Sequence, residues 1–264
     1  MCIAYLKLGD PNQPIFIAAN RDEFHARPSR AATPWPDRPD IISGLDLQAG
    51  GTWLGLRHDG RFALLTNYRE PGSHRDKAPS RGALVHDFLL STQAAHDYAG
   101  AMHAAGADYN GFNLLVGDLS DTLYVGNRAA QAAPEPISPG SHVLSNHLLD
   151  TPWPKAMRLR KGLDDLDLAD MDQAIEDAFA LLRDDAPAAD RDLPDTGVPI
   201  ELERLLSSPF IVSPDYGTRC STVIAIGADG QALFSEISYD PAGRPTERHD
   251  WRFPIQTGRA PALK

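Results

Sequence analysis

Short apolar runs, broken by glycine, proline, asparagine and aspartate, recur along the chain and predict strands that pair as hairpins. The turn Asp10-Pro11-Asn12 separates the first two runs, and the pair Asp59-Gly60, which favours a tight turn, separates two others. The predicted strands are residues 2–8, 15–19, 50–56, 61–67, 112–117, 122–126, 142–146, 221–226, 232–239 and 251–253.

Apolar positions with helical spacing occur between these groups of strands. The clearest case lies over residues 170–183, where Met171, Ile175 and Phe179 share one stripe and acidic residues occupy the first turn. The predicted helices are residues 82–90, 93–105, 154–163 and 170–183. Two proline-rich polar stretches are expected to contain neither helix nor strand: a long ordered loop over 24–50 and a linker over 184–198.

Strands in hairpin groups, separated by groups of helices, differ from the strict strand–helix alternation of parallel sheets. The pattern predicts antiparallel sheets covered by helices, an α+β layered domain. No shift in composition marks a boundary, so we expect residues 1–264 to form one domain.

The charge balance narrows the classes of partner. The net charge is -11 and the sequence pI is about 5.2, which disfavours nucleic acid and anionic membranes as partners. No apolar run is long enough to span a membrane, and the start of the chain lacks the features of a secretory signal. Cys2 and Cys220 alone do not make a disulfide framework, so we expect a reducing, cytoplasmic location.

Cys2 is the first candidate for chemistry. If Met1 is removed, one residue carries a thiol with a pKa of about 8.5 and an α-amine with a pKa of about 7.7–8.0. The amine can take the thiol proton, as in a self-activated nucleophile. The alternative is that Cys2 is a small apolar residue of the first strand, and position alone favours neither interpretation.

Polar clusters at strand ends are the other candidates. Hairpin pairing would bring the charged residues of 20–23 back toward Cys2. Asn67 and Asn146 each end an apolar strand, where an amide could stabilise an oxyanion or simply form a turn. Arg219 precedes Cys220 and could favour a thiolate or lie on the surface.

Several common catalytic patterns are missing from the sequence, including the nucleophile elbow, the phosphate-binding loop, the dinucleotide fingerprint and paired metal-ligand motifs. The histidines are scattered without ligand spacing, so no metal site is predicted.

Taken together, these stretches closely resemble the NRDE family, which is the family of transport and Golgi organization protein 2. The resemblance covers nearly the whole chain in order. The matching segments are Met1-Cys2-Ile3, Ala18-Ala19-Asn20-Arg21-Asp22-Glu23-Phe24, Arg27-Pro28, Gly44-Leu45-Asp46, Gly50-Gly51-Thr52-Trp53-Leu54-Gly55, Leu65-Thr66-Asn67-Tyr68, Tyr109-Asn110-Gly111-Phe112-Asn113-Leu114, Leu144-Ser145-Asn146, Thr151-Pro152-Trp153 and Tyr216-Gly217-Thr218-Arg219.

That family is distantly similar to the N-terminal-nucleophile hydrolases of the choloylglycine hydrolase and penicillin V acylase type. The resemblance implies a four-layer αββα sandwich. By position, Cys2 matches the nucleophile, Asp22 the aspartate that contacts its amine, Asn67 and Asn146 the oxyanion and orienting asparagines, and Arg219 the late arginine. Residues expected to bind substrate are Asn20, Arg21, Glu23, Trp53, Tyr68 and Asn113.

One departure concerns an arginine that those hydrolases place three residues before the aspartate, where this chain has Ala19. Arg21 adjoins Asp22, and because side chains alternate along a strand, we expect Arg21 to face away from the thiol.

Two functions therefore remain open. The first is an amide or thioester hydrolase that uses Cys2 and requires no cofactor. The second is a non-catalytic carrier of haem or an acyl-coenzyme A, ligands that the family's links imply. His25, His142 and His147 could ligate haem, but no pattern distinguishes one of them. A basic rim from Arg21, Arg27, Arg69 and Arg219 would favour a small anionic ligand in either case. A purely structural interaction module would have no pocket at Cys2.

Overall fold

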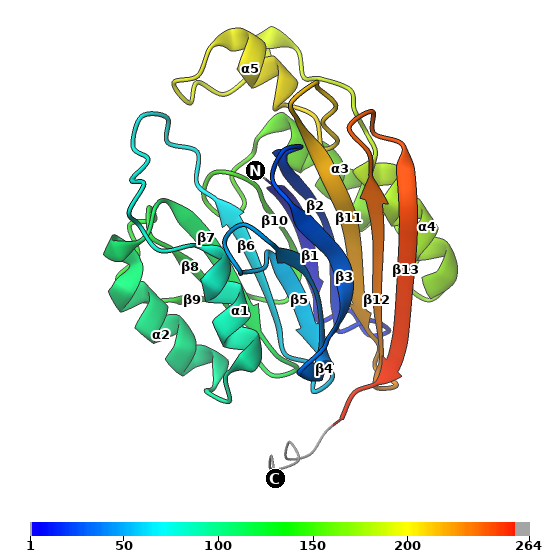
Figure 1. Cartoon of the computed structure of the whole chain (residues 1–264). Coiled ribbons are helices and arrows are strands. Elements are labelled where there is room, and N and C mark those ends of the chain that lie inside the picture. Colours follow the sequence, from blue (N-terminus) through cyan, green and yellow to red (C-terminus); the bar gives the residue numbers. More distant parts are fainter. Residues whose placement is uncertain (1, 257–264) are drawn as a thin grey trace.

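Two antiparallel sheets stack face to face, and helices cover the outer face of each (Figure 1). The computed structural model describes residues 2–256. The strands are β1 (Cys2–Leu8), β2 (Ile15–Phe24), β3 (Ser29–Trp35), β4 (Arg38–Asp46), β5 (Leu54–Arg57), β6 (Phe62–Asn67), β7 (Phe112–Gly117), β8 (Thr122–Gly126), β9 (Glu135–Pro136), β10 (Gly140–Leu144), β11 (Tyr216–Ile226), β12 (Gln231–Tyr239) and β13 (Pro245–Pro254).

Within the described residues, one sheet has the strand order β10-β1-β2-β11-β12-β13 and the other the order β3-β4-β5-β6-β7-β8-β9. The helices are α1 (Gly82–Leu90), α2 (Ala95–Ala105), α3 (Pro154–Asp164), α4 (Met171–Leu182) and α5 (Ile200–Leu205), with short 3-10 turns at Gly106–Asp108 and Asp190–Asp192. Helices α3 and α4 pack on the six-stranded sheet, and α1 and α2 on the seven-stranded sheet. The predicted α+β fold, a four-layer αββα sandwich, is confirmed.

Strand alternation sends apolar side chains into three buried clusters. Along β2, Ile17 and Ala19 face the other sheet, whereas Phe16 and Ala18 face α3 and α4. A third cluster lies between the seven-stranded sheet and α1 and α2. Because helices cover both outer faces, the strands carry nearly continuous apolar runs rather than a polar alternation.

The long loop predicted for residues 24–50 is wrong, because β3 and β4 form a hairpin there. Proline lacks the amide proton of an interior strand, but it is accepted at sheet edges and strand starts. Pro34 lies in β3, which is the edge of its sheet, and Pro39 is the second residue of β4. Pro34 and Pro39 are therefore compatible with a hairpin at the edge of the sheet and do not require a loop.

Other differences concern the ends of elements. β2 continues to Phe24 and β11 begins at Tyr216, so both include polar residues that the sequence placed outside the strands. The two strands pair with each other along this polar stretch, with a bulge between Thr218 and Cys220. The short helix α5 was not predicted. These extensions carry the polar ends of β2 and β11 up to the site described below.

Gly51 makes a backbone contact that allows no side chain. A Cβ atom on Gly51 would lie 2.4 Å from the carbonyl carbon of Gly82, the first residue of α1. We therefore expect Gly51→Ala to lower the free energy of unfolding in urea by about 1–3 kcal/mol, the usual effect of overpacking. Gly100→Ala in α2 is the matched control, because its Cβ would meet no atom within 4 Å. It should be neutral or stabilising, and equal effects of the two substitutions would contradict the steric explanation.

Candidate active site

Cys2 lies directly opposite Arg21 in the antiparallel pair of β1 and β2. Ala19, Arg21 and Glu23 lie on the same face of β2 because they are two residues apart. Ala19 belongs to the cluster between the sheets, so Cys2 and Arg21 both face the other sheet. The expectation that Arg21 faces away from the thiol is wrong; Asp22 has the opposite orientation.

A cavity of about 290 Å³ opens at this position. Its wall includes Cys2, Arg21, Glu23, Trp53 and Asn67. The opposite wall comes from residues 74–81, in the segment between β6 and α1, and from Gly82, the first residue of α1. Figure 1 shows this segment (cyan), the start of the chain and α5 at the same end of the sandwich. A pocket at Cys2 argues against a purely structural module.

Arg21 is almost completely buried beside the thiol. Its side chain is 6% exposed, and its guanidinium lies over the ring of Trp53 at 4.3 Å from the centroid. Nη2 lies 3.9 Å from a carboxylate oxygen of Glu23, and Nη1 has no hydrogen-bond partner among the described residues. Since buried charged donors are rarely left unsatisfied, this nitrogen is an exception among the described polar atoms.

The electrostatics of Cys2 oppose its ionisation. Burial raises the pKa of the thiol, and the Asp22 carboxylate raises it further. A hydrogen bond from the Asp22 backbone and the charge of Arg21 lower the pKa in part. The thiol therefore needs a proton acceptor close by to become a nucleophile at neutral pH.

Asp22 is buried on the helix-covered face of β2. Its Oδ1 accepts a hydrogen bond of 2.7 Å from the Thr218 hydroxyl on β11. Burial raises the pKa of this carboxyl, whereas the charge of Lys155, the hydroxyl of Thr218 and the charge of Arg21 lower it. The carboxyl lies near the start of β1, as an aspartate that orients a terminal amine requires.

Asn67 and Asn146 lie next to each other. The Asn146 side-chain amide donates a 3.0 Å hydrogen bond to the main-chain oxygen of Asn67. Within residues 2–256 no hydrogen bond engages the side-chain amide of Asn67, which lies on the cavity wall. Asn67 is thus placed to contact a ligand, and Asn146 is placed to fix Asn67.

Besides Asn146, four predicted residues lie outside the cavity wall. Asn20 donates to the main-chain oxygens of Leu182 and Pro209, on the helix side of the sheet. Asn113 is fully buried between the hydroxyl groups of Thr66 and Tyr124. The remaining two are Tyr68 and Arg219.

The last two have other contacts. Tyr68 packs against the ring of His147. The guanidinium of Arg219 donates to the main-chain oxygens of Phe24, His25 and Arg27, so it holds the turn after β2. Arg219 therefore stabilises the turn that follows β2 and does not line the cavity at Cys2.

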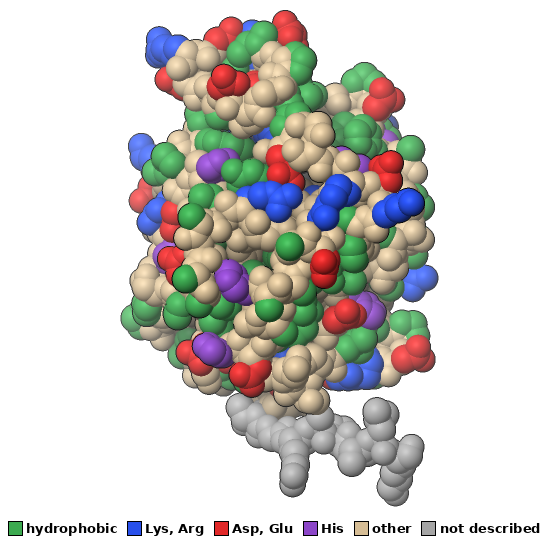
Figure 2. Space-filling model, turned by 90° about the vertical axis from the view of Figure 1, so that its left-hand side faces the viewer, with side chains coloured by type: hydrophobic (Ala, Val, Ile, Leu, Met, Phe, Trp, Pro, Cys, Tyr) green, Lys and Arg blue, Asp and Glu red, His purple; other side chains and the backbone are tan. Residues whose placement is uncertain are grey.

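The basic rim also differs from the prediction. Arg21 and Arg27 line the cavity, but Arg69 is buried in an ion pair of 2.7 Å with Glu203 on α5. Arg75 and Arg81, which the sequence did not single out, line the cavity instead. Figure 2 shows basic and acidic side chains interspersed over one face of the molecule. The cavity wall is mixed as well, because its four arginines lie beside Asp22, Glu23, Asp46 and Asp76.

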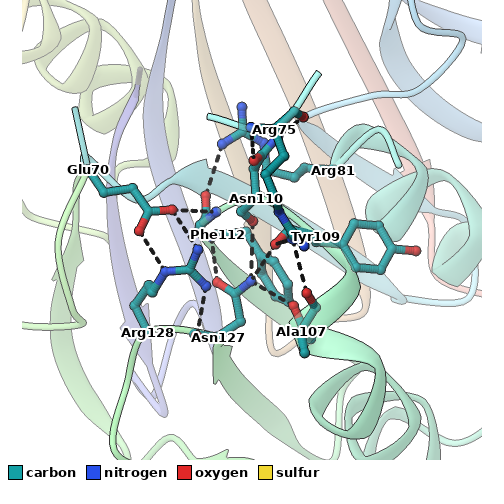
Figure 3. A network of polar contacts seen from close by, with 11 residues as sticks. Glu70, Arg75, Arg81, Ala107, Tyr109, Asn110, Phe112, Asn127 and Arg128 are labelled. Atoms are coloured by element: carbon teal, nitrogen blue, oxygen red, sulfur yellow. Dashed lines mark hydrogen bonds and ion pairs between the residues drawn. The ribbon is translucent and has the colours of Figure 1, made fainter. Parts of the chain in front are cut away.

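A polar network fixes the wall opposite Cys2 (Figure 3). The Asn110 side chain accepts from the main-chain nitrogen of Arg75 and donates to its oxygen, as a paired strand would. Arg75 donates to the oxygens of Ala107 and Tyr109, and Arg81 to that of Gly111. The segment is held in place through main-chain atoms.

Glu70 anchors the start of the same segment (Figure 3). Its carboxylate pairs with two nitrogens of Arg128, each at 2.7 Å, and also accepts from the main-chain nitrogen of Gly111. A bidentate pair of this kind fixes both partners.

Lys155 is a further charged residue that sequence reasoning missed. It is 1% exposed, and its Nζ has no hydrogen-bond partner among the described residues. The available signal was its place directly after Pro154, since a lysine in the first turn of a helix opposes the helix dipole.

The histidines considered for haem are not on the cavity wall. Both ring nitrogens of His142 are engaged, by Asp150 and by the main-chain oxygen of Ser138. Nε2 of His25 contacts the Ser213 oxygen, and Nδ1 of His147 contacts Thr151. His74 is the histidine that lines the cavity.

Two features are absent from residues 2–256. No group of three or more histidine, cysteine or acidic side chains is arranged to hold a metal ion. None of the helices has the length and apolar character required to cross a bilayer.

Comparisons with known proteins agree with the fold and with the sequence resemblance. Residues 1–241 match the family model described as Transport and Golgi organisation 2. The Transport and Golgi organization protein 2 homolog of Bos taurus is 38% identical over 284 residues, which cover 96% of this chain and 99% of the relative. The Homo sapiens homolog is 38% identical over 263 residues, with coverage of 90% and 93%.

Among solved structures, the chain is similar to a penicillin V acylase from Agrobacterium tumefaciens, with a TM-score of 0.53. The match covers 96% of this chain and 86% of the acylase, at 14% sequence identity. At that identity the likeness shows a shared fold, that of the N-terminal-nucleophile hydrolases.

The wall opposite Cys2 can be tested through Asn110. Asn110→Ala removes both hydrogen bonds to the main chain of Arg75. We expect trypsin to cleave the folded variant after Arg75 or Lys77 faster than it cleaves the unsubstituted protein. The loss of these bonds should cost about 1–3 kcal/mol of local stability. Asn12→Ala, in the exposed turn between β1 and β2, is the control. Identical cleavage of the two variants would show that Asn110 does not anchor the wall.

Proposed function

The chain belongs to the Transport and Golgi organisation 2 family, and on this premise we propose that it is a hydrolase of a carbon–nitrogen amide or thioester bond, with Cys2 as its nucleophile. The observation that carries the proposal is the place of Cys2, at the start of β1 and on the wall of a polar cavity of about 290 Å³. The fold shared with an acylase supports it.

The nucleophile requires a base, because burial raises the pKa of the Cys2 thiol. In the proposed mechanism, removal of Met1 exposes the α-amine of Cys2, which accepts the thiol proton. Asp22 orients this amine, and Thr218 holds the Asp22 carboxylate by a 2.7 Å hydrogen bond.

The thiolate attacks the substrate carbonyl, and the tetrahedral intermediate places a negative charge on its oxygen. The unengaged amide of Asn67 donates to this oxygen, and Asn146 holds Asn67 through its main-chain oxygen. Collapse expels the amine or thiol, which takes the proton, and leaves a thioester on Cys2. Water then hydrolyses the thioester, which releases the acid and restores the thiol.

Arg21 takes the part of the arginine that the N-terminal-nucleophile hydrolases carry where this chain has Ala19. The two residues share one face of β2, and Arg21 is the one directly opposite Cys2. Its charge favours the thiolate, and the residue forms part of the cavity wall. Arg81 adds a second charge on the facing wall. The substrate is therefore expected to be a small acyl compound that carries an anionic group.

The alternative is binding without chemistry. The raised pKa of the Cys2 thiol favours it, because a protonated thiol is a poor nucleophile. The carrier would use the same cavity for an acyl-coenzyme A or haem. In that case Cys2→Ala would retain saturable binding of the ligand in calorimetry or absorbance titration, and no product would form with the native protein.

The central experiment combines intact-mass measurement with an assay of N-acyl amino acids and acyl thioesters. Protein that lacks Met1 should hydrolyse at least one of these substrates, and Cys2→Ala should abolish turnover because the thioester intermediate cannot form. Cys220→Ala is the matched control, since Cys220 is buried and outside the cavity wall. Full activity in Cys2→Ala, or in protein that retains Met1, would refute the mechanism.

A second test concerns the oxyanion. Asn67→Ala should lower kcat by about 10²–10³, the usual loss of one oxyanion donor, with a smaller change in KM. The exposed Asn12→Ala serves as control. An unchanged kcat in Asn67→Ala would exclude the amide of Asn67 from the transition state.

A further inference from the structure

We propose that Lys155 is a positioning residue of the Cys2 site, whose buried ammonium acts from α3 to hold Asp22 in its charged form. The proposal rests on the role given to Asp22 above. It assigns a function to a side chain that lies outside the cavity wall and was not implied by the sequence motifs.

The placement of Lys155 is costly, which argues against an incidental role. Lys155 is 1% exposed, and within residues 2–256 its Nζ makes no hydrogen bond. An ammonium buried without hydrogen bonds costs free energy. As the residue after Pro154, it also lies at the positive end of the α3 dipole. Neither packing nor the helix explains a cation here.

Two other charged residues that act on Lys155 pair with each other, so Asp22 is the acidic side chain whose negative charge Lys155 compensates. Arg69, after β6, and Glu203, on α5, form a buried ion pair with an Nη1–Oε2 distance of 2.7 Å. The remaining groups that act on Lys155 are Asp22 on β2 and the Cys2 thiol on β1. Asp22 is the larger of these influences and favours the ammonium.

The effect is reciprocal. Burial raises the pKa of the Asp22 carboxyl, and Lys155 opposes this more strongly than Thr218 or Arg21 does. Burial also lowers the pKa of Lys155 to about 8, with Asp22 opposing that change. Below about pH 8 the ammonium is present and keeps Asp22 ionised; above it the ammonium is lost. The nearby charge also favours the Cys2 thiolate.

A stability measurement separates this role from a structural one. Because folding lowers the pKa of Lys155, burial of the ammonium opposes folding at pH 7, where the residue is charged in both states. Lys155→Met removes the charge and keeps the length of the side chain. We therefore expect the variant to have an equal or higher Tm, while its thiol reacts more slowly.

The decisive experiment is the pH profile of Cys2 alkylation by iodoacetamide, followed by mass spectrometry on protein of known N-terminus. In Lys155→Met alkylation should be about tenfold slower at pH 7, where the native ammonium is present, and the two profiles should converge above about pH 8, where that ammonium is lost. Lys155→Arg, which keeps the charge, should restore most of the native rate. Lys161→Met, exposed on the same helix, should match the native profile.

A profile for Lys155→Met that superimposes on the native one would overturn the proposal. A second measurement does not depend on the folding of Lys155→Met, because it uses the unsubstituted protein. NMR of ¹³Cε-labelled lysine should show one lysine that titrates near pH 8. Asp22→Asn should lower that midpoint, and an unchanged midpoint would also overturn the proposal. Neither readout requires turnover, so a failure of the hydrolase proposal remains distinguishable.

Discussion

The pairing of β2 between β1 and β11 is the constraint on which the site depends. It places Arg21 opposite Cys2 on one side and opposite Cys220 on the other, and it places Asp22 opposite Thr218. Because alternate residues of β2 face opposite ways, one short stretch supplies a guanidinium to the space between the sheets and a carboxylate to the helix layer. A register slip of one residue would exchange these charges.

Such charges are tolerated at this end of the sandwich because each has a compensating feature. Arg21 stacks on Trp53, Arg69 pairs with Glu203, and Asp22 is held by Thr218 with Lys155 nearby. The apolar clusters hold the sheets and helices together, so the strand ends can carry polar groups that contribute little packing. The cost of burying them is consistent with a functional role, since active sites commonly concentrate shifted pKa values.

Much of this architecture could be predicted from sequence. Apolar periodicity located most helices and the strands 112–117 and 122–126, and the motifs around Cys2, Asp22, Asn67 and Asn146 identified residues that the fold gathers. The hairpin of β3 and β4 was missed because its prolines lie at a sheet edge, a position that a linear pattern does not reveal. The orientation of Arg21 depended on register, and the burial of Lys155 and Arg69 depended on which helix covers which strand. These are tertiary facts, and the one local signal among them was the place of Lys155 in the first turn of its helix.

The anchoring of the wall opposite Cys2 has an evolutionary consequence. The side chains of Asn110, Arg75 and Arg81 hold that wall through bonds to main-chain atoms, so its position does not depend on the other side chains that line the cavity. Residues such as His74, Asp76 and Ala78 can therefore change without moving the segment that carries them. The same scaffold can acquire a new ligand preference by a few substitutions, while the chemistry at the start of β1 stays intact.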